Sequence, residues 1–375
     1  MDVATSISRA ANPSNPLLSH GQPSPSTKEL EGQTVPHLHP SQIIKRYLLE
    51  RSQEFREITE LRQQGWDNPE GDSFFKRQRE NADRSDDQTA MYFFNLMIRI
   101  GHELHRSTGA FALPQNPSIL DMCMAPGGYL EVALSKNPGS DALAFTLPVS
   151  DGGHKVLCRN ASDVEIRYLD VTMLAADMGV EQIPEDHPDA ERFLPRQLEP
   201  HRLFDLVLCD GQVLRTHTRA SYREWREAKR LTTTQLALGL EHLRPGGTMV
   251  VLLHKLEAWD TVNCLWRFDK FSTVKLLKPQ SGHAKRSSFY MVATNIQPLH
   301  PEAVRSIEVW KNAWKVATFG SDEEHQRTTR DGELDVGRLL DEFGLKLIEL
   351  GRDVWKIQAG ALAKAPFIQD ARARR

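Results

Sequence analysis

The sequence predicts an α/β fold, in which a mostly parallel sheet carries helices on both faces and is extended by helices at both ends. Two observations support this. Between about residues 111 and 300, short apolar segments typical of buried strands alternate with helical patterns. The flanking residues, 41–110 and 301–375, show only the helical spacing of apolar side chains. In parallel sheets of this kind, ligands bind beyond the carboxyl ends of the strands.

The first 40 residues contain six prolines, many serines and few apolar residues. Such a segment cannot bury enough apolar surface to offset its ordering entropy, so we predict a disordered tail over residues 1–40. A helical N-terminal extension over residues 41–110 follows, and Ser41 is the expected N-cap of its first helix. We expect helices in this extension at residues 41–61, 72–81 and 89–105.

Residues 111–300 form the expected sheet domain. Its predicted strands are 118–123, 141–147, 164–169, 204–210 and 247–255, with a closing pair at 273–278 and 288–294. Its predicted helices are 127–134 and 232–243. A C-terminal helical extension over residues 301–375 is expected to contain helices at 303–316, 336–343 and 353–362.

Composition excludes several classes of protein. The longest apolar runs fall far short of the ~20 residues of a membrane-spanning helix, and the first residues lack the pattern of a secretory signal. We therefore expect an intracellular protein, cytoplasmic or nuclear, with no membrane partner. The four cysteines, Cys123, Cys158, Cys209 and Cys264, are too far apart for a metal knuckle, so we expect core thiols and no metal. The net charge of −3 means that binding to nucleic acid would require a local basic surface.

The stretch from Asp121 to Tyr129 is the most informative motif. A strand ends in an acid, and Pro126 then precedes the glycine pair Gly127 and Gly128 at the start of a helix. Glycine pairs allow close backbone approach, and a helix N-terminus directs N–H groups at a ligand. The motif therefore favours a nucleotide-type cofactor at this loop.

This stretch resembles the first motif of the FtsJ-like ribose 2′-O-methyltransferases, in which an acid precedes Ala-Pro-Gly-Gly and an aromatic residue. The resemblance continues in order through residues 204–211, residues 235–251 and Lys255, and ends with Lys278-Pro and residues 286–294. It covers about residues 70–296, and leaves both ends of the chain outside. The resemblance implies a Rossmann-like methyltransferase sheet that uses S-adenosyl-L-methionine (SAM).

The family pattern also implies which residues bind SAM. Asp170 would contact the adenine amino group, and the glycine loop would line the methionine and ribose side. Thr146 stands where the family often has an acid that grips the ribose hydroxyls, and a threonine offers only a neutral hydrogen bond. The implied cofactor-binding residues are Asp121, Gly127, Gly128, Tyr129, Thr146, Asp170 and Asp210.

Methyl transfer to a ribose hydroxyl requires alignment of the oxygen and removal of its proton, and the family uses a lysine base held by an aspartate and a second lysine. The resemblance assigns the base to Lys255 and its partner to Asp210. The second lysine is assigned to Lys76, although Arg77 is adjacent and Lys45 is also available.

A glutamate completes the family's catalytic set, but Ser288 stands at its position in this sequence. No acid lies between Asp269 and Glu302, and Glu257 is the nearest alternative. A serine can orient an ammonium group but adds no negative charge. The altered position leaves three interpretations open: an active enzyme with an altered catalytic set, an enzyme that acts on a different acceptor, and an inactive fold used for binding.

Two basic segments follow the strands that carry Asp210 and Lys255, at about residues 214–230 and 270–286. Both could face one groove and bind phosphates, and His217, Tyr222 and Trp225 could stack on bases. The expected RNA contacts are Arg215, Arg219, Arg223, Arg226, Lys285 and Arg286. The alternative interpretation of the first segment is a solvated amphipathic surface helix.

The sequence thus favours a SAM-dependent RNA ribose 2′-O-methyltransferase. Two alternatives stay open: a methyltransferase fold that binds RNA with weak or no catalysis, and a small-molecule O-methyltransferase. Labelled methyl transfer to RNA separates them, because cofactor binding alone is common to all three.

Overall fold

The computed structural model describes residues 39–83, 87–159, 164–330 and 335–373. The predicted tail over residues 1–40 lies almost wholly outside this part of the chain. His39–Arg375 form one compact unit that contains the sheet and the helices on either side of it in sequence. In the described part of the chain, no helix is both long enough and apolar enough to cross a membrane.

Seven strands form one mixed sheet with the order β3-β2-β1-β4-β5-β7-β6. The strands are β1 (Ser118–Asp121), β2 (Asp141–Thr146), β3 (Val164–Tyr168), β4 (Phe204–Cys209), β5 (Leu243–His254), β6 (Thr273–Leu277) and β7 (Ser288–Ile296). The first five are parallel, and β7 runs antiparallel between β5 and β6. The predicted strands and fold class are confirmed. The order reverses direction between β1 and β4, which is where a ligand cleft is expected.

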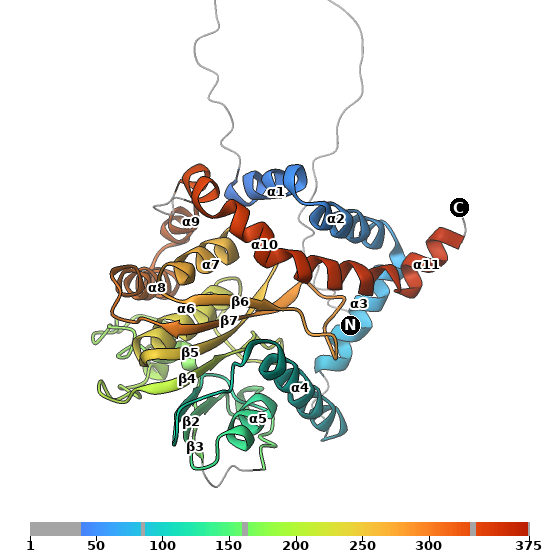
Figure 1. Ribbon diagram of the computed structural model, residues 1–375. Coiled ribbons are helices and arrows are strands. Elements are labelled where there is room, and N and C mark those ends of the chain that lie inside the picture. The colour runs from blue at the N-terminus through green and yellow to red at the C-terminus, as the bar shows by residue number, and fades with distance from the viewer. Residues whose placement is uncertain (1–38, 84–86, 160–163, 331–334, 374–375) are drawn as a thin grey trace, which may run out of the picture. The chain divides into compact units, whose positions relative to one another are not determined.

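Alternating side chains of the strands belong to two separate cores, one on each face of the sheet. On one face, Ile119, Leu206 and Val250 pack with α4 (Asp87–Thr108) and α5 (Gly128–Lys136). The opposite face packs against α6 (Glu227–Glu241), α7 (Trp259–Phe271), α8 (Pro301–Phe319) and α10 (Val336–Ala363). Figure 1 shows these two helical layers on either side of the sheet.

The N-terminal extension begins with two helices where one was expected. Ser52 ends α1 (Pro40–Arg51) with an extended backbone and caps α2 (Gln53–Trp66), because its hydroxyl accepts the N–H of Phe55 at 3.1 Å. The predicted cap Ser41 instead accepts the N–H of Trp259 at 3.0 Å, which ties α1 to the start of α7. The next helix, α3 (Pro69–Asp83), agrees with the prediction.

The C-terminal extension differs from the prediction at its centre. Instead of two short helices, α10 is a single helix that runs across α1 and α2. Glycines within it allow close packing, since a Cβ at Gly344 would lie 2.5 Å from the hydroxyl of Tyr47. The prediction also missed α7, α9 (Asp322–Arg330) and α11 (Pro366–Ala373). In α7, apolar side chains at Trp259, Val262 and Trp266 do follow a helical period.

Helices on both sides of the sheet domain in sequence share its main core. Trp355 of α10 is fully buried and contacts Phe55 of α2 edge to face, with ring centroids 5.2 Å apart. The extensions and the sheet should therefore unfold together.

We expect Trp355→Ala to lower the free energy of unfolding by about 3–5 kcal/mol, because it leaves a large cavity in a shared core. Urea unfolding followed by circular dichroism measures this. The control Leu345→Ala, on the same helix but 77% exposed, should change stability by about 0.5 kcal/mol or less. If Trp355→Ala produced a separate early unfolding transition and left the main transition unchanged, this would contradict a shared core.

Candidate cofactor and active site

Two carboxyl groups lie together at the centre of the sheet edge. Asp121 ends β1, and Asp210 directly follows β4, the parallel neighbour of β1. Burial raises the pKa of Asp121 well above its usual range, and the charge of Asp210 raises it further. Burial also raises the pKa of Asp210 to about 7. Two adjacent buried carboxyl groups resist double ionisation, so the pair retains a proton near neutral pH.

The Oδ1 atom of Asp210 is buried and has no hydrogen-bond partner among the described residues. The loop after it is fixed, however: Gln235 of α6 accepts the N–H of Gly211 at 2.9 Å and donates to its carbonyl at 3.3 Å. Gln235 is a positioning residue that the sequence analysis missed. A fixed carboxylate oxygen without a donor fits a cationic or N–H-bearing ligand.

A cavity of about 200 Å³ lies at the carboxyl ends of β1 to β4. Three of the predicted cofactor residues, Thr146, Asp170 and Asp210, line it. This volume is below the ~300–1,000 Å³ of typical ligand sites. The cavity is small because the loop after β2 meets the loop after β4, where the hydroxyl of Thr216 donates to the carbonyl of Gly152 at 2.9 Å. We therefore expect these loops to separate when SAM binds.

Asp170 has little acceptor capacity left for a ligand. Its Oδ1 accepts the N–H and the hydroxyl of Thr172 at 2.9 and 2.8 Å, and its Oδ2 accepts from the Arg223 guanidinium at 2.7 Å. One direction at Oδ2 remains, on the side of His217. Burial favours a higher pKa for Asp170, but Arg223, His217 and Thr172 outweigh it and hold the pKa below its usual value.

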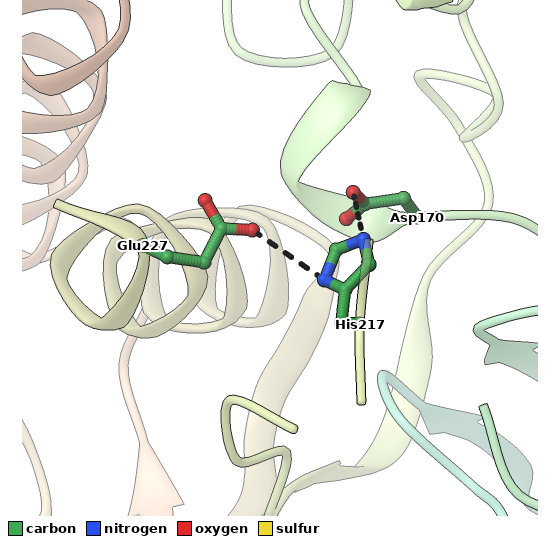
Figure 2. A group of neighbouring side chains, drawn as sticks. All are labelled: Asp170, His217 and Glu227. Atoms are coloured by element: carbon green, nitrogen blue, oxygen red, sulfur yellow. Dashed lines mark ion pairs between the residues drawn. The ribbon is translucent and has the colours of Figure 1, made fainter. Parts of the chain in front are cut away.

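His217 lies between Asp170 and Glu227, as Figure 2 shows. Its Nε2 is 3.4 Å from Asp170 Oδ2, its Nδ1 is 3.9 Å from Glu227 Oε1, and the residue is only 9% exposed. Nε2 makes no hydrogen bond within the described part of the chain, although the residue lines the cavity. The two orphaned polar atoms, His217 Nε2 and Asp210 Oδ1, fit the polar groups of a nucleoside cofactor with a cationic centre.

The three side chains of Figure 2 have the residue types of a metal site, but a guanidinium already lies between the two carboxylates. Arg223 bonds both Asp170 and Glu227, and Glu227 also accepts from Arg230 at 3.0 Å. A metal ion would have to displace the guanidinium from these oxygens. The cluster is therefore best described as a buried ion-pair network that supports the cavity wall.

The predicted glycine loop packs against protein rather than against the cavity. Gly127 has a φ of 101°, and a Cβ there would lie 3.0 Å from Cys158 Cβ. A Cβ at Gly128 would lie 2.6 Å from the carbonyl oxygen of Phe94, so this glycine is required for α4 to approach α5. Tyr129 is buried, and its hydroxyl bonds that of Tyr290 on β7.

Lys255 directly follows β5, and β5 is the parallel neighbour of β4, the strand that Asp210 follows. It is exposed and has a left-handed backbone, with a φ of 49°, which is uncommon outside glycine and is often found at functional sites. A hydrogen bond of 2.7 Å between His254 and Gln212 joins the last residue of β5 to the segment that follows β4. The structure thus brings the Asp210 loop and the Lys255 turn together.

The other predicted catalytic positions lie differently. Lys76 is exposed on α3 and is 3.9 Å from Glu80, while its neighbours Phe74 and Phe75 pack on Phe367. The structure therefore does not bring Lys76 to Asp210.

The fourth catalytic position contains no carboxylate. Ser288 is buried at the start of β7, opposite His254. The alternative Glu257 pairs with Arg62 of α2 at 2.7 Å, so one of its oxygens is used to hold the N-terminal extension.

Sequence analysis placed Lys278 in the last family motif and within the second basic segment, but missed its structural role, because this residue directly follows β6 and is only 2% exposed. Its Nζ donates to the carbonyls of His283 and Ser288 at 3.1 and 2.6 Å, and also to that of Arg286. Burial, with the charge of Arg62, lowers its pKa to about 7. Lys278 thus holds the β6–β7 loop, whose Ser287 carbonyl accepts the N–H of Lys255. The Lys278-Pro pair was the available sequence signal.

The expected RNA contacts in residues 214–230 require a correction. Arg223 is fully buried in the ion-pair network, and Arg226 is buried against Gly320 and Asp322. Arg219 is largely covered and makes a bidentate pair with Glu224. These guanidinium groups neutralise carboxylates of the protein and are not available to phosphates.

The first basic segment is not a surface helix either, because it forms a loop with a short 3₁₀ turn (Ser221–Arg223) before α6 begins at Glu227. Arg215 is exposed in this loop. In the second basic segment, Lys285 is half-buried with its ammonium 5.6 Å from the Phe74 ring centre, and Arg286 lies near Gln78.

We expect Arg223→Ala to destabilise the protein by about 3–5 kcal/mol, since it leaves Asp170 and Glu227 buried without their cation. Urea unfolding measures this. The control Arg215→Ala removes an exposed charge from the same segment and should change stability by well under 1 kcal/mol. Equal stability of the two variants would contradict the structural role of Arg223.

The carboxyl pair predicts that SAM binds more tightly as pH rises. A cationic ligand favours the ionised pair, so binding near pH 7 should release the retained proton, and affinity should rise about tenfold from pH 6 to pH 8. Calorimetry in two buffers of different ionisation enthalpy measures the proton release. Asp210→Asn should leave only the titration of SAM itself, and an unchanged pH dependence in this variant would contradict the assignment.

Comparison with known proteins identifies the family. The family model described as FtsJ-like methyltransferase matches residues 99–296, which are 198 of the 375 residues. No curated protein matches the chain in sequence.

Three solved structures resemble this chain at low similarity. A protein described as a ribosomal RNA methyltransferase from Plasmodium falciparum is 16% identical, with 53% of this chain and 97% of that chain covered and a TM-score of 0.33. The N-methyltransferase NodS from Bradyrhizobium japonicum is 14% identical, with 53% and 95% covered and a TM-score of 0.33. The pyocyanin biosynthetic protein PhzM is 14% identical, with 55% and 56% covered and a TM-score of 0.31. At these values the likenesses carry no argument about function.

The assignment therefore depends on the family model, which covers more than half of the chain, and on the sheet order and cavity described above. The protein belongs to the FtsJ-like methyltransferase family, and its cofactor is S-adenosyl-L-methionine.

Proposed function

We propose that this protein transfers a methyl group from SAM to the 2′-hydroxyl of a ribose in RNA. The observation that carries the proposal is the junction between the ends of β4 and β5. There Asp210 presents a buried carboxyl oxygen that has no hydrogen-bond partner among the described residues, and the His254–Gln212 bond holds its loop beside the Lys255 turn. An aspartate and a lysine at the ends of neighbouring strands, next to a cofactor cavity, suit the removal of a hydroxyl proton.

Bound SAM supplies a methyl group on a cationic sulfur, which the ribose oxygen attacks. Asp210 offers a negative charge to that cationic centre when it is ionised. Asp170 and Thr146 line the part of the cavity suited to the nucleoside. Lys255 Nζ, as the neutral amine, would accept the hydroxyl proton, while SAM would supply the methyl group and leave as its demethylated product.

RNA is the proposed acceptor because the Lys255 turn, which we call the catalytic turn, is hydrogen-bonded to the basic β6–β7 loop. The N–H of Lys255 donates to the Ser287 carbonyl at 3.1 Å, and Lys285 and Arg286 precede that residue. A strand whose ribose reaches Lys255 would therefore pass these two cations. Both side chains are half-buried in this structure, so they suit one or two phosphates rather than an extended surface.

A second candidate function is RNA or SAM binding without turnover. Two observations favour it: Lys76 lies on the outer surface of α3, and Ser288 provides no carboxylate. The catalytic set of the proposal is thus limited to Asp210 and Lys255, and rate measurements separate the two functions.

We expect Lys255→Ala and Asp210→Ala to lower methyl transfer to RNA by about 10²–10⁴-fold. Transfer is measured with methyl-labelled SAM, and ribose methylation is recognised because the modified linkage resists alkaline cleavage. Lys255→Ala should retain SAM affinity, since Lys255 does not line the cavity. The matched control is Lys275→Ala, which removes an exposed lysine from β6.

Three outcomes would count against the proposal. Label in alkali-sensitive positions would indicate base methylation, and label only in small molecules would exclude RNA as acceptor. No transfer to any RNA fraction by wild-type protein that binds SAM would establish the second candidate.

A further inference from the structure

An open groove of about 530 Å³ lies where α4 meets the end of α5, outside the cofactor cavity. Five of its six lining side chains are basic or can become so: Arg99, His102, His105, Arg106 and Lys136, with Ser281 as the sixth. Arg99, His102 and Arg106 project from one face of α4, because residues three and seven apart lie close together on a helix. Lys136 ends α5, which packs against α4. We call this the α4–α5 groove.

The cations of the groove are not paired with acids in the described part of the chain. Among the described residues, Arg99, His102, Arg106 and Lys136 form no ion pair, and all four are exposed. The one acid within this stretch of α4 is Glu103, whose carboxylate accepts the N–H groups of Gln280 and Ser281 at 2.8 Å each.

His105 lines the same groove and lies close to its positive charges. Its ring stacks on Phe111, and its Nδ1 is buried with no partner in the described part of the chain. Burial lowers the pKa of His105, and the charges of Lys136 and His102 lower it further. The groove therefore concentrates positive charge beside an unsatisfied polar atom.

The groove is connected to the catalytic turn through the β6–β7 loop. One end of this loop lies on α4, where Glu103 holds Ser281 and a Cβ at Gly282 would meet Leu96 at 2.6 Å. The other end reaches Ser287, which is bonded to Lys255. Ser287 is six positions after Ser281 in the sequence, so the two residues are at most about 22 Å apart. One short segment of single-stranded RNA could therefore reach both the groove and Lys255.

From this arrangement we infer that the α4–α5 groove binds the phosphates of the RNA on one side of the acceptor ribose. The inference rests on the proposed function and adds the surface that holds the substrate. Phosphates suit the groove better than an acidic protein does, because protein interfaces are depleted of charge at their centre, whereas nucleic-acid interfaces are strongly positive. This surface replaces the one that the sequence predicted in residues 214–230.

The test neutralises three cations of the groove in the full-length protein with Arg99→Gln, Arg106→Gln and Lys136→Gln together. Binding of a fluorescent single-stranded RNA is measured by anisotropy at several salt concentrations. We expect affinity to fall about 10–100-fold near 0.1 M salt, and the slope of log K against log salt to fall by about 2, since each lost phosphate contact contributes about 0.7. SAM affinity should stay the same.

The matched control is the triple variant Lys315→Gln, Lys356→Gln and Lys364→Gln, which removes three exposed cations on and next to α8 and α10. Figure 1 shows these helices on the opposite side of the sheet from α4 and α5. The control should bind RNA like wild type. Equal losses in both triple variants would mean that only net charge matters, and unchanged binding in the groove variant would overturn the inference.

Catalysis separates this inference from the proposed function. If both hold, the groove variant should raise KM for RNA while kcat at saturating RNA stays within about twofold of wild type. Methyl transfer with an unchanged KM for RNA in the groove variant would refute RNA binding by the groove and leave the proposed function intact. RNA binding through the groove without methyl transfer would refute the proposed function alone, and absence of RNA binding in wild type would refute both.

Discussion

The arrangement of the site depends on two carboxyl groups held side by side, Asp121 and Asp210, at the ends of neighbouring parallel strands. The strand order forces this proximity, because β1 and β4 are adjacent at the point where the sheet reverses direction. Burial makes the pair hold a proton, and leaves one oxygen without a donor. A cationic cofactor resolves both conditions, since it favours ionisation and supplies the missing charge. In the proposed site, binding of SAM would offset the free-energy cost of keeping two carboxyl groups buried side by side.

A second buried network supports the cavity wall and explains why the arginine-rich segment is not an RNA surface. Arg223 and Arg230 lie among Asp170, Asp189 and Glu227, and their ion pairs fix the turn after β3 against the start of α6. Networks of this kind are costly to break at one member, because the remaining charges stay buried. Protein cations that could bind RNA phosphates must therefore lie outside this network. Exposed or half-buried cations are found in the α4–α5 groove, in the β6–β7 loop next to the Lys255 turn, and at Arg215.

Local patterns predicted the strands and most helices well, because the spacing of apolar residues and the residue types at strand ends can be read from neighbouring positions in the sequence. Contacts distant in sequence were not predictable in this way. Arg223 looked like a surface cation, but its partners Asp170 and Asp189 lie 53 and 34 residues away. Lys76 followed two aromatic residues, and their burial against Phe367 of the C-terminal extension turns the lysine outward. Likewise, the three basic residues of α4 are spaced among apolar ones, and only folding brings them to Lys136.

A structure of the protein with S-adenosylhomocysteine, the demethylated product, tests the account most directly. We predict that the ligand occupies the cavity at the ends of β1 to β4, with its sulfur nearest Asp210, its nucleoside against Asp170 and His217, and the loops after β2 and β4 moved apart. Ligand bound elsewhere on the chain, or an unchanged cavity at saturating ligand, would contradict it.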